Sequence, residues 1–354
     1  TVGMDQVKAT MESGFGAILD IPGLNYRVHL YEEAYDKFPQ GFILGSETAS
    51  TVSSRGIYKF PVEKASMKEY PDFQSSSYDL EYCSWSNLPE TDFIMQDDKP
   101  WVIGEFVWTG FDYLGEPTPY DTSWPSRSSY FGMIDLAGIP KDRYYLYRSR
   151  WNTEDETLHM LPHWNWEGRE GKKTPVFVYT SYDRAELFVN GKSQGIRIKN
   201  DSTPQTRYRL MWNDVIYEPG TLKVVALDKN GKQAAEKTIK TAGKPHQIIL
   251  EADRKTITAN GKDLSFVTVS VVDKNGNPCP TATNALKFKV SGKGNFKAVC
   301  NGDPTSLASF YEPQMKLFSG KLVVLLESTK NPGNLNLEVS GKQLKKATIS
   351  ITTL

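Results

Sequence analysis

Apolar and polar positions alternate in two different ways along the 354 residues of the chain. Up to about residue 150, short apolar runs of the kind found in fully buried strands are separated by segments with helical spacing. The apolar runs lie at residues 16–26, 41–47 and 99–113, and the helical spacing lies at residues 5–13 and 31–38. Buried strands that alternate with helices are typical of parallel βα units, so this region predicts a parallel sheet.

From about residue 155, polar and apolar residues alternate regularly, which is typical of strands with one buried face. The dipeptide Asn-Gly interrupts this pattern at residues 190 and 230, and it favours the tight turns that join antiparallel strands. After a break at residues 241–247 the same pattern resumes and continues to the C-terminus. We therefore predict two immunoglobulin-like β-sandwiches, at residues 153–243 and 244–354.

Polar and aromatic side chains follow each predicted strand of the first region. Asn25 and Tyr26 end the first run, Glu47 ends the second, and Trp108 lies at the end of the third. In a (β/α)8 TIM barrel the chemistry sits at the carboxyl ends of the strands, and a closed barrel needs roughly 200 residues or more. Residues 1–152 therefore predict only the C-terminal part of such a barrel. The remainder would come from upstream sequence or another polypeptide, and an exposed apolar edge would favour aggregation or a homo-oligomer.

Composition argues against several classes of function. Lys plus Arg and Asp plus Glu number 42 each, so the chain lacks the net basic charge expected of a nucleic-acid-binding protein. No apolar run approaches the roughly 20 residues that span a bilayer, so we expect no membrane partner. Three cysteines form no disulfide framework, although a pair between Cys279 and Cys300 is an open alternative. The four histidines offer one ligand-like spacing, His159 and His163, and we expect neither metal nor cofactor.

Several stretches of the chain resemble glycoside hydrolase family 2, close to its bacterial β-galactosidases. The longest and most specific motif is GEFVWTGFDYLGEPTPY at residues 104–120, and GLNY at 23–26 and GFILGSETAS at 41–50 accompany it. These resemble the C-terminal half of the catalytic barrel. LPHWNWEGREG at 161–171 resembles the start of the immunoglobulin-like domain that follows, and VCNGDPTS at 299–306 resembles a motif of the final sandwich. The resemblance covers essentially the whole chain.

The resemblance implies retaining, exo-acting hydrolysis of terminal β-galactosides in an oligo- or polysaccharide, by two carboxylates about 5 to 5.5 Å apart. Glu47 matches the family nucleophile, and the small residues after it leave room for a sugar ring. Tyr26 matches the tyrosine that hydrogen-bonds the nucleophile. Trp108 is suited to stacking on galactose, Asn25 to contacting a sugar hydroxyl, and Trp85 to lining the outer pocket. The alternatives are structural: a surface glutamate, a barrel-rim tyrosine, an asparagine in a turn and tryptophans in the core.

The second carboxylate has no counterpart in the chain. The family places the acid/base in an Asn-Glu pair at the end of strand four, and the chain contains no Asn-Glu dipeptide. Glu105 is expected to be structural, because the acid and the nucleophile come from strands across the barrel. We therefore expect this segment to be inactive by itself.

Other glycosidases and a non-enzyme are the alternative interpretations. Family glucuronidases carry an Asn-x-Lys motif after strand eight, whereas residues 124–135 contain Arg127 and no such motif, which favours a neutral sugar. A mannosidase is still open. The non-enzymatic alternative is a module in which two sandwiches bind carbohydrate or a partner beside a decayed barrel.

The N-terminal residues 1–16 lack the charged and apolar regions of a signal peptide, and Thr1 is not an initiator. We expect the chain to be a segment of a longer protein. Its location is unknown from the sequence. Appended sandwiches are associated with periplasmic or secreted carbohydrate-degrading enzymes, and only this association suggests a periplasmic or secreted location.

Overall fold

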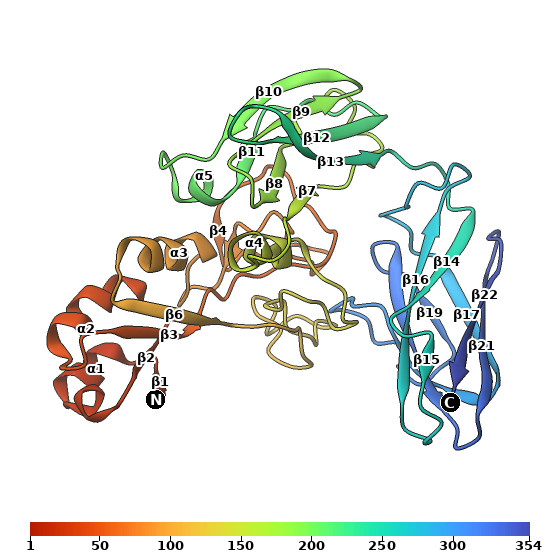
Figure 1. The fold of residues 1–354 in the computed structure, drawn as a ribbon, viewed down its shortest axis with the longest axis horizontal. Coiled ribbons are helices and arrows are strands. Elements are labelled where there is room, and N and C mark those ends of the chain that lie inside the picture. Colours follow the sequence, from red (N-terminus) through yellow and green to blue (C-terminus); the bar gives the residue numbers. More distant parts are fainter.

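The computed structural model describes residues 1–354. Its N-terminal part is a parallel sheet of four strands in the order β1-β2-β3-β6 (Figure 1). These strands are Val2–Met4, Pro22–Asn25, Ile43–Thr48 and Val102–Val107. The last three match the three predicted runs, whereas β1 went unpredicted because three residues are too short to display a period.

Helices cover one face of this sheet. They are α1 (Val7–Glu12), α2 (Tyr31–Lys37) and α3 (Pro89–Asp98), and two 3-10 turns lie at Phe15–Ile18 and Val28–Leu30. The shared core contains residues from both layers, among them Val7, Tyr31, Ile43 and Val102. Helix α3 begins with proline at its first position and acids in its first turn, which suit the free N–H groups there.

The sheet ends at β6 with apolar side chains open to solvent. Ile103 is 53% exposed and Phe106 is 66% exposed. An exposed apolar edge is what a partial barrel leaves, although the barrel itself stays a prediction. The same part of the chain also contains the two-stranded pair β4 (Ala65–Ser66) and β5 (Glu81–Tyr82), and helix α4 (Asp142–Trp151).

The second region is antiparallel, as the alternating pattern predicts. Its sheets have the orders β10-β9-β12-β13 and β11-β8-β7. The strands, with one short helix α5 (Pro204–Tyr208), are β7 Leu158–Leu161, β8 Val176–Thr180, β9 Arg184–Val189, β10 Lys192–Ile198, β11 Leu210–Trp212, β12 Thr221–Leu227 and β13 Gln233–Lys240. Asn190 and Gly191 both have positive φ, 49° and 79°, as a two-residue turn between β9 and β10 requires.

The third region is a second pair of facing sheets, β14-β16-β20-β18 and β15-β22-β21-β17-β19. All neighbours pair antiparallel except the short β15 with β22. The strands are β14 Gln247–Ala252, β15 Thr256–Ile257, β16 Leu264–Val272, β17 Ala285–Gly292, β18 Gly294–Cys300, β19 Gln314–Lys316, β20 Lys321–Ser328, β21 Gly333–Gly341 and β22 Ala347–Thr353. A core of 20 buried residues lies between them. Cys279 and Cys300 are free thiols, so the disulfide alternative is wrong.

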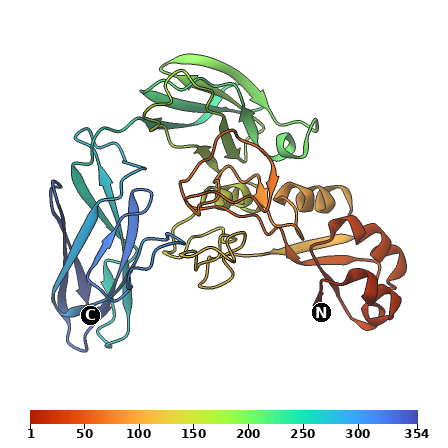
Figure 2. The ribbon, with the colours of Figure 1, turned by 180° about the vertical axis from the view of Figure 1, so that it is seen from behind.

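The three regions are joined by specific contacts. Strand β8 is buried on both faces, because one side packs in the second region's core and the other packs on α3 and α4. The loops between β6 and α4 lie between the parallel sheet and the third region in both views (Figures 1 and 2). No helix of the structure has the length and apolar character needed to cross a membrane.

Candidate active site

The carboxyl ends of β2 and β3 bring Glu47 beside Asn25 and Tyr26. Asn25 lies opposite Glu47 in the parallel register, and the backbone N–H of Tyr26 donates to the Glu47 carbonyl oxygen at 2.7 Å. Adjacent parallel strands end at one edge of a sheet, so residues 21 and 22 positions apart in sequence become neighbours. The predicted grouping of these three residues is therefore present in the structure.

Both carboxylate oxygens of Glu47 accept a hydrogen bond. Tyr26 Oη donates to Oε1 at 2.6 Å, and Asn25 Nδ2 donates to Oε2 at 3.2 Å. The side-chain oxygen Oδ1 of Asn25 in turn accepts from Ser46 Oγ at 2.8 Å, which fixes the orientation of the side-chain amide. The carboxylate is thus held in one rotation while its side chain stays partly exposed.

Tyr26 is positioned by an unusual backbone and by a second donor. Its φ is +53°, a left-handed conformation that few non-glycine residues adopt and that clusters at functional sites. Ser50, which sequence reasoning missed, donates from Oγ to Tyr26 Oη at 2.7 Å. Burial raises the pKa of Tyr26 and the hydrogen bond to Glu47 raises it further, while Ser50 and Trp85 act in the opposite direction. The phenol therefore keeps its proton and serves as a donor.

Trp108 and Trp85 lie in segments that contact the ends of β3 and β2. The backbone N–H of Trp108 donates to the Thr48 carbonyl oxygen at 2.8 Å, and its indole meets the edge of Tyr113 with ring centroids 6.0 Å apart. Trp85 and Trp108 are both half-buried against one apolar cluster. The Trp85 carbonyl oxygen accepts from Arg27 Nη1 at 2.7 Å, which ties its loop to the end of β2.

Tyr113 is a neighbour of Glu47 that the sequence did not single out. Burial raises its pKa most, a hydrogen bond to Glu116 raises it next, and the charge of Glu47 contributes as well. The available signal was its position in the aromatic-rich stretch that begins at Trp108.

Glu105 lies behind the site rather than in it. Its Oε2 accepts from Thr48 Oγ1 at 2.6 Å, and Thr48 directly follows the nucleophile candidate. Burial raises the pKa of Glu105, and burial and the Glu105 charge raise that of Asp92. The carboxyl therefore supports the strand end, as the sequence predicts.

Asp112 also has a structural position. Its carboxylate pairs with the buried Lys141 ammonium at 2.5 Å and accepts from the Gly132 N–H at 2.8 Å. Burial raises the pKa of Asp112 to about 6, against the effect of Lys141. A Cβ at Gly132 would lie 2.2 Å from the Asp112 nitrogen, so only glycine allows this approach.

Other residues of the motifs at 161–171 and 299–306 have structural positions, with Trp164 in the core of the second region. Trp164 is fully buried, and the rings of His163 and Trp166 stack with centroids 4.2 Å apart. The Asn301 carbonyl oxygen accepts from the Arg55 guanidinium at 2.8 Å. No three His, Cys, Asp or Glu side chains are grouped so as to hold a metal ion.

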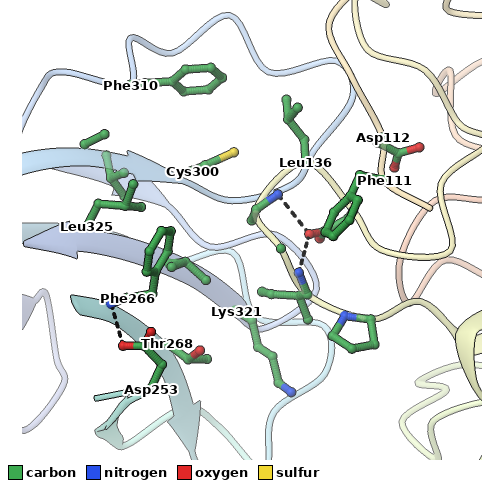
Figure 3. A pocket seen from close by; sticks show the side chains of 18 of the residues that line it. Phe111, Asp112, Leu136, Asp253, Phe266, Thr268, Cys300, Phe310, Lys321 and Leu325 are labelled. Carbon is green, nitrogen blue, oxygen red and sulfur yellow. Dashed lines mark hydrogen bonds between the residues drawn. The ribbon is translucent and has the colours of Figure 1, made fainter. Parts of the chain in front are cut away.

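The two main cavities of the structure lie away from Glu47. One, of about 730 Å³, runs between the loop at residues 135–140 and the outer face of the third region (Figure 3). The other, of about 560 Å³, lies where the three regions meet. Neither is lined by Glu47, Tyr26 or Trp108. Glu47 therefore lies outside both of these cavities.

Two family models match the C-terminal regions. Residues 248–350 match the glycoside hydrolase family 2 C-terminal domain 5, and residues 171–235 match a domain of unknown function (DUF4982). Both matches lie in the part of the chain that the structure builds from antiparallel sheets.

Similar proteins extend the likeness to the N-terminal part. The chain is 42% identical over 344 residues to "Beta-galactosidase BoGH2A" of Bacteroides ovatus, covering 95% of this chain and 39% of that protein. It is 33% identical over 243 residues to a putative β-glucuronidase of Formosa agariphila, covering 66% of this chain and 22% of that protein. A solved β-glycosidase from Bacteroides vulgatus superimposes with a TM-score of 0.82 at 33% identity, covering 94% of this chain and 45% of that one. The chain thus spans less than half the length of these relatives.

Proposed function

The chain belongs to glycoside hydrolase family 2, and from this premise we propose that it is the nucleophile-bearing part of a retaining exo-β-galactosidase. In this proposal Glu47 attacks the sugar, Tyr26 and Asn25 orient it, Trp108 is the platform for the galactose ring, and Trp85 lines the outer pocket. The observation that carries the proposal is the partly exposed Glu47 carboxylate, held by donors on both oxygens at the carboxyl ends of parallel strands.

The proposed reaction has two displacements. In the first, a Glu47 oxygen bonds to the anomeric carbon, the bond from that carbon to the leaving oxygen breaks, and the leaving oxygen takes a proton from a second carboxyl group. In the second, water gives up a proton to that same group, its oxygen bonds to the anomeric carbon, and the bond to Glu47 breaks. Tyr26 would stabilise the charge that returns to Glu47 in this step.

The second carboxyl group is proposed to come from outside these 354 residues. Glu105 is directed at Thr48 and is mostly buried, which leaves it unsuited to meet a leaving oxygen. The proposal therefore requires the rest of a barrel from upstream sequence, and it expects the isolated segment to be inactive.

A neutral sugar fits the surroundings of the site better than a uronic acid. Arg127 is the cation of the stretch that replaces the glucuronidase Asn-x-Lys motif, and its guanidinium lies 5.4 Å from the ring centroid of Phe310 in the third region. Its backbone N–H donates to the Pro304 carbonyl oxygen at 3.1 Å. An arginine directed toward the third region favours galactoside over glucuronide. Because similar proteins are named β-glucuronidase, the test below includes a β-glucuronide substrate.

The test compares kinetics with aryl β-galactoside, β-glucuronide and β-mannoside for the protein that includes the upstream sequence. We expect Glu47→Gln to abolish turnover of the galactoside, while Glu63→Gln, which changes an exposed carboxylate paired with Lys68, retains it. Retained activity in Glu47→Gln would refute the assignment. Faster turnover of the glucuronide would replace the sugar but keep the nucleophile. Binding of polysaccharide by residues 155–354 without any hydrolysis by the longer protein would favour the non-catalytic alternative.

A further inference from the structure

A polar cavity of about 560 Å³ lies where the three regions of the chain meet. Its wall includes Arg55 from the first region, His159 and Lys237 from the second, and Lys321 from the third. Lys321, the first residue of β20, also lines the larger cavity that Figure 3 shows. The cavity excludes Glu47, so it is separate from the proposed active site.

Positive charge dominates this wall. Arg55, Lys237, Lys240 and Lys321 line the cavity, and Asp142 is the one carboxylate that does so. Asp142 is already engaged, because one oxygen accepts from Tyr58 Oη at 2.7 Å and the other from His159 Nε2 at 2.6 Å. Arg55 is likewise paired, with Asp135 at 2.5 Å. Lys237 and Lys321 have no hydrogen-bonded acid of their own.

The cations of this wall repel one another. Burial lowers the pKa of Lys237, and the charge of Lys321 lowers it further against the attraction of Asp142. Burial also lowers the pKa of Lys321, and the charge of Arg55 lowers it further against Glu251 and Asp135. Like charges that line one cavity cost free energy, which a bound anion would offset.

His159 adds a hydrogen-bond acceptor to the same wall. Since Asp142 accepts from Nε2–H, the neutral ring presents Nδ1 as an acceptor, and burial lowers the pKa of His159 and so favours the neutral form. Nδ1 is buried and has no partner.

The ligand class follows from charge and size. A dianion can meet two lysines at once, whereas a carboxylate carries a single charge. The cavity also far exceeds an inorganic phosphate, which is only a few times the roughly 30 Å³ of a water molecule. We propose that this cavity binds a phosphate monoester, with the phosphate between Lys237 and Lys321 and the organic part in the remaining volume of the cavity.

Isothermal titration calorimetry of the full chain tests the proposal, with glycerol 2-phosphate, inorganic phosphate and acetate as probes at equal ionic strength. We expect one saturable site for glycerol 2-phosphate and weaker binding of the other two. The Kd should rise at least about tenfold in Lys237→Gln and in Lys321→Gln, the loss expected for one charged hydrogen bond. Lys229→Gln, at the exposed tip of the β12–β13 hairpin, is the matched control and should leave the Kd unchanged.

Three results would overturn the proposal. One is the absence of saturable binding of glycerol 2-phosphate up to about 20 mM, a range that covers weak millimolar sites. Another is an equal effect of Lys229→Gln, which would indicate general screening of charge. The third is equal affinity for inorganic phosphate, which would overturn the assignment to an ester. Glu47→Gln should bind the probe as the unmodified chain does, so the outcome does not depend on the proposed glycosidase activity.

Discussion

Replacing Tyr26 with phenylalanine removes one oxygen atom next to the proposed nucleophile. That oxygen donates to Glu47 Oε1 at 2.6 Å and accepts from Ser50 Oγ at 2.7 Å. The ring is 5% exposed and would stay in place, so the variant leaves no cavity and should fold. The change therefore removes two hydrogen bonds, of which only the one to Glu47 reaches the proposed nucleophile.

The size of the effect follows from the charge on the acceptor. A hydrogen bond to a charged group is worth about 1.5–3 kcal/mol, roughly twice a neutral one. At about 1.36 kcal/mol for each factor of ten in rate, its loss corresponds to a decrease of about ten- to hundredfold or slightly more. The effect should fall on the second displacement, in which Glu47 leaves the sugar as a carboxylate and Tyr26 stabilises its returning charge.

The assay is steady-state and burst kinetics with an activated aryl β-galactoside, on the protein that includes the upstream sequence. We expect kcat to fall about ten- to hundredfold, and KM to fall with it because the glycosyl-enzyme accumulates. A burst of one aryl group per site should precede the slow steady state. Tyr120→Phe is the matched control, since that phenol is buried and contacts the Tyr70 N–H instead of Glu47.

Two outcomes would refute this reasoning. A kcat within twofold of the unmodified protein would mean that the phenol does not support the nucleophile. An equal loss in Tyr120→Phe would mean that the decrease reflects general damage to the aromatic cluster rather than the bond to Glu47.

Three further predictions concern the sugar platform, the contact between regions and pH. Trp108→Ala should raise KM for galactosides about tenfold through lost stacking, whereas Trp124→Ala, 72% exposed, should not; equal effects would contradict the platform role. Arg55→Met leaves the buried Asp135 carboxylate unpaired and should cost about 3–5 kcal/mol; an unchanged Tm by calorimetry would contradict this. Burial lowers the pKa of His163 to about 4, so the unfolded chain binds the extra proton below pH 6.5 and stability falls between pH 6.5 and 4, by about 2 kcal/mol at pH 5. His163→Phe should flatten this decrease in Tm, and an unchanged pH profile would contradict it.

Local patterns were sufficient to predict β2, β3 and β6 and to place Asn25, Tyr26 and Glu47 at neighbouring strand ends. The apolar runs that became β2, β3 and β6 are each followed directly by the side chains in question, so the parallel arrangement brings Asn25 beside Glu47. The period-two pattern likewise indicated the antiparallel sheets, because strands such as β9 and β16 have one buried face.

Helices α3 and α4 were not predicted from the sequence because charged residues interrupt their apolar faces. Glu90 and Asp92 are buried in α3, and Arg143 is buried in α4. Arg143 donates to the Phe131 and Gly132 carbonyl oxygens, which lie 12 and 11 positions away in sequence. A hydropathy pattern counts a charged residue as solvent-exposed, even when its hydrogen-bond partner in another segment allows it to be buried. Such a residue therefore interrupts the helical period of apolar positions.

Contacts between regions could not be predicted from the sequence, because their partners also come from distant segments. Arg55 bonds to Asp135 and to the Asn301 and Phe318 carbonyl oxygens, at sequence separations of 80, 246 and 263. No spacing rule connects residues so far apart. The cavity at the junction of the three regions depends on these contacts, and for that reason only the folded chain reveals it.

The most direct measurement concerns the carboxylate at the end of β3. The protein with its upstream sequence would be treated with a 2-fluoro-β-galactosyl fluoride, digested and analysed by peptide mass spectrometry. The account predicts a fluorogalactosyl ester on Glu47, lost in Glu47→Gln and prevented by competing galactose. Complete inactivation with the label on another residue, or normal activity with Glu47 unmodified, would contradict it.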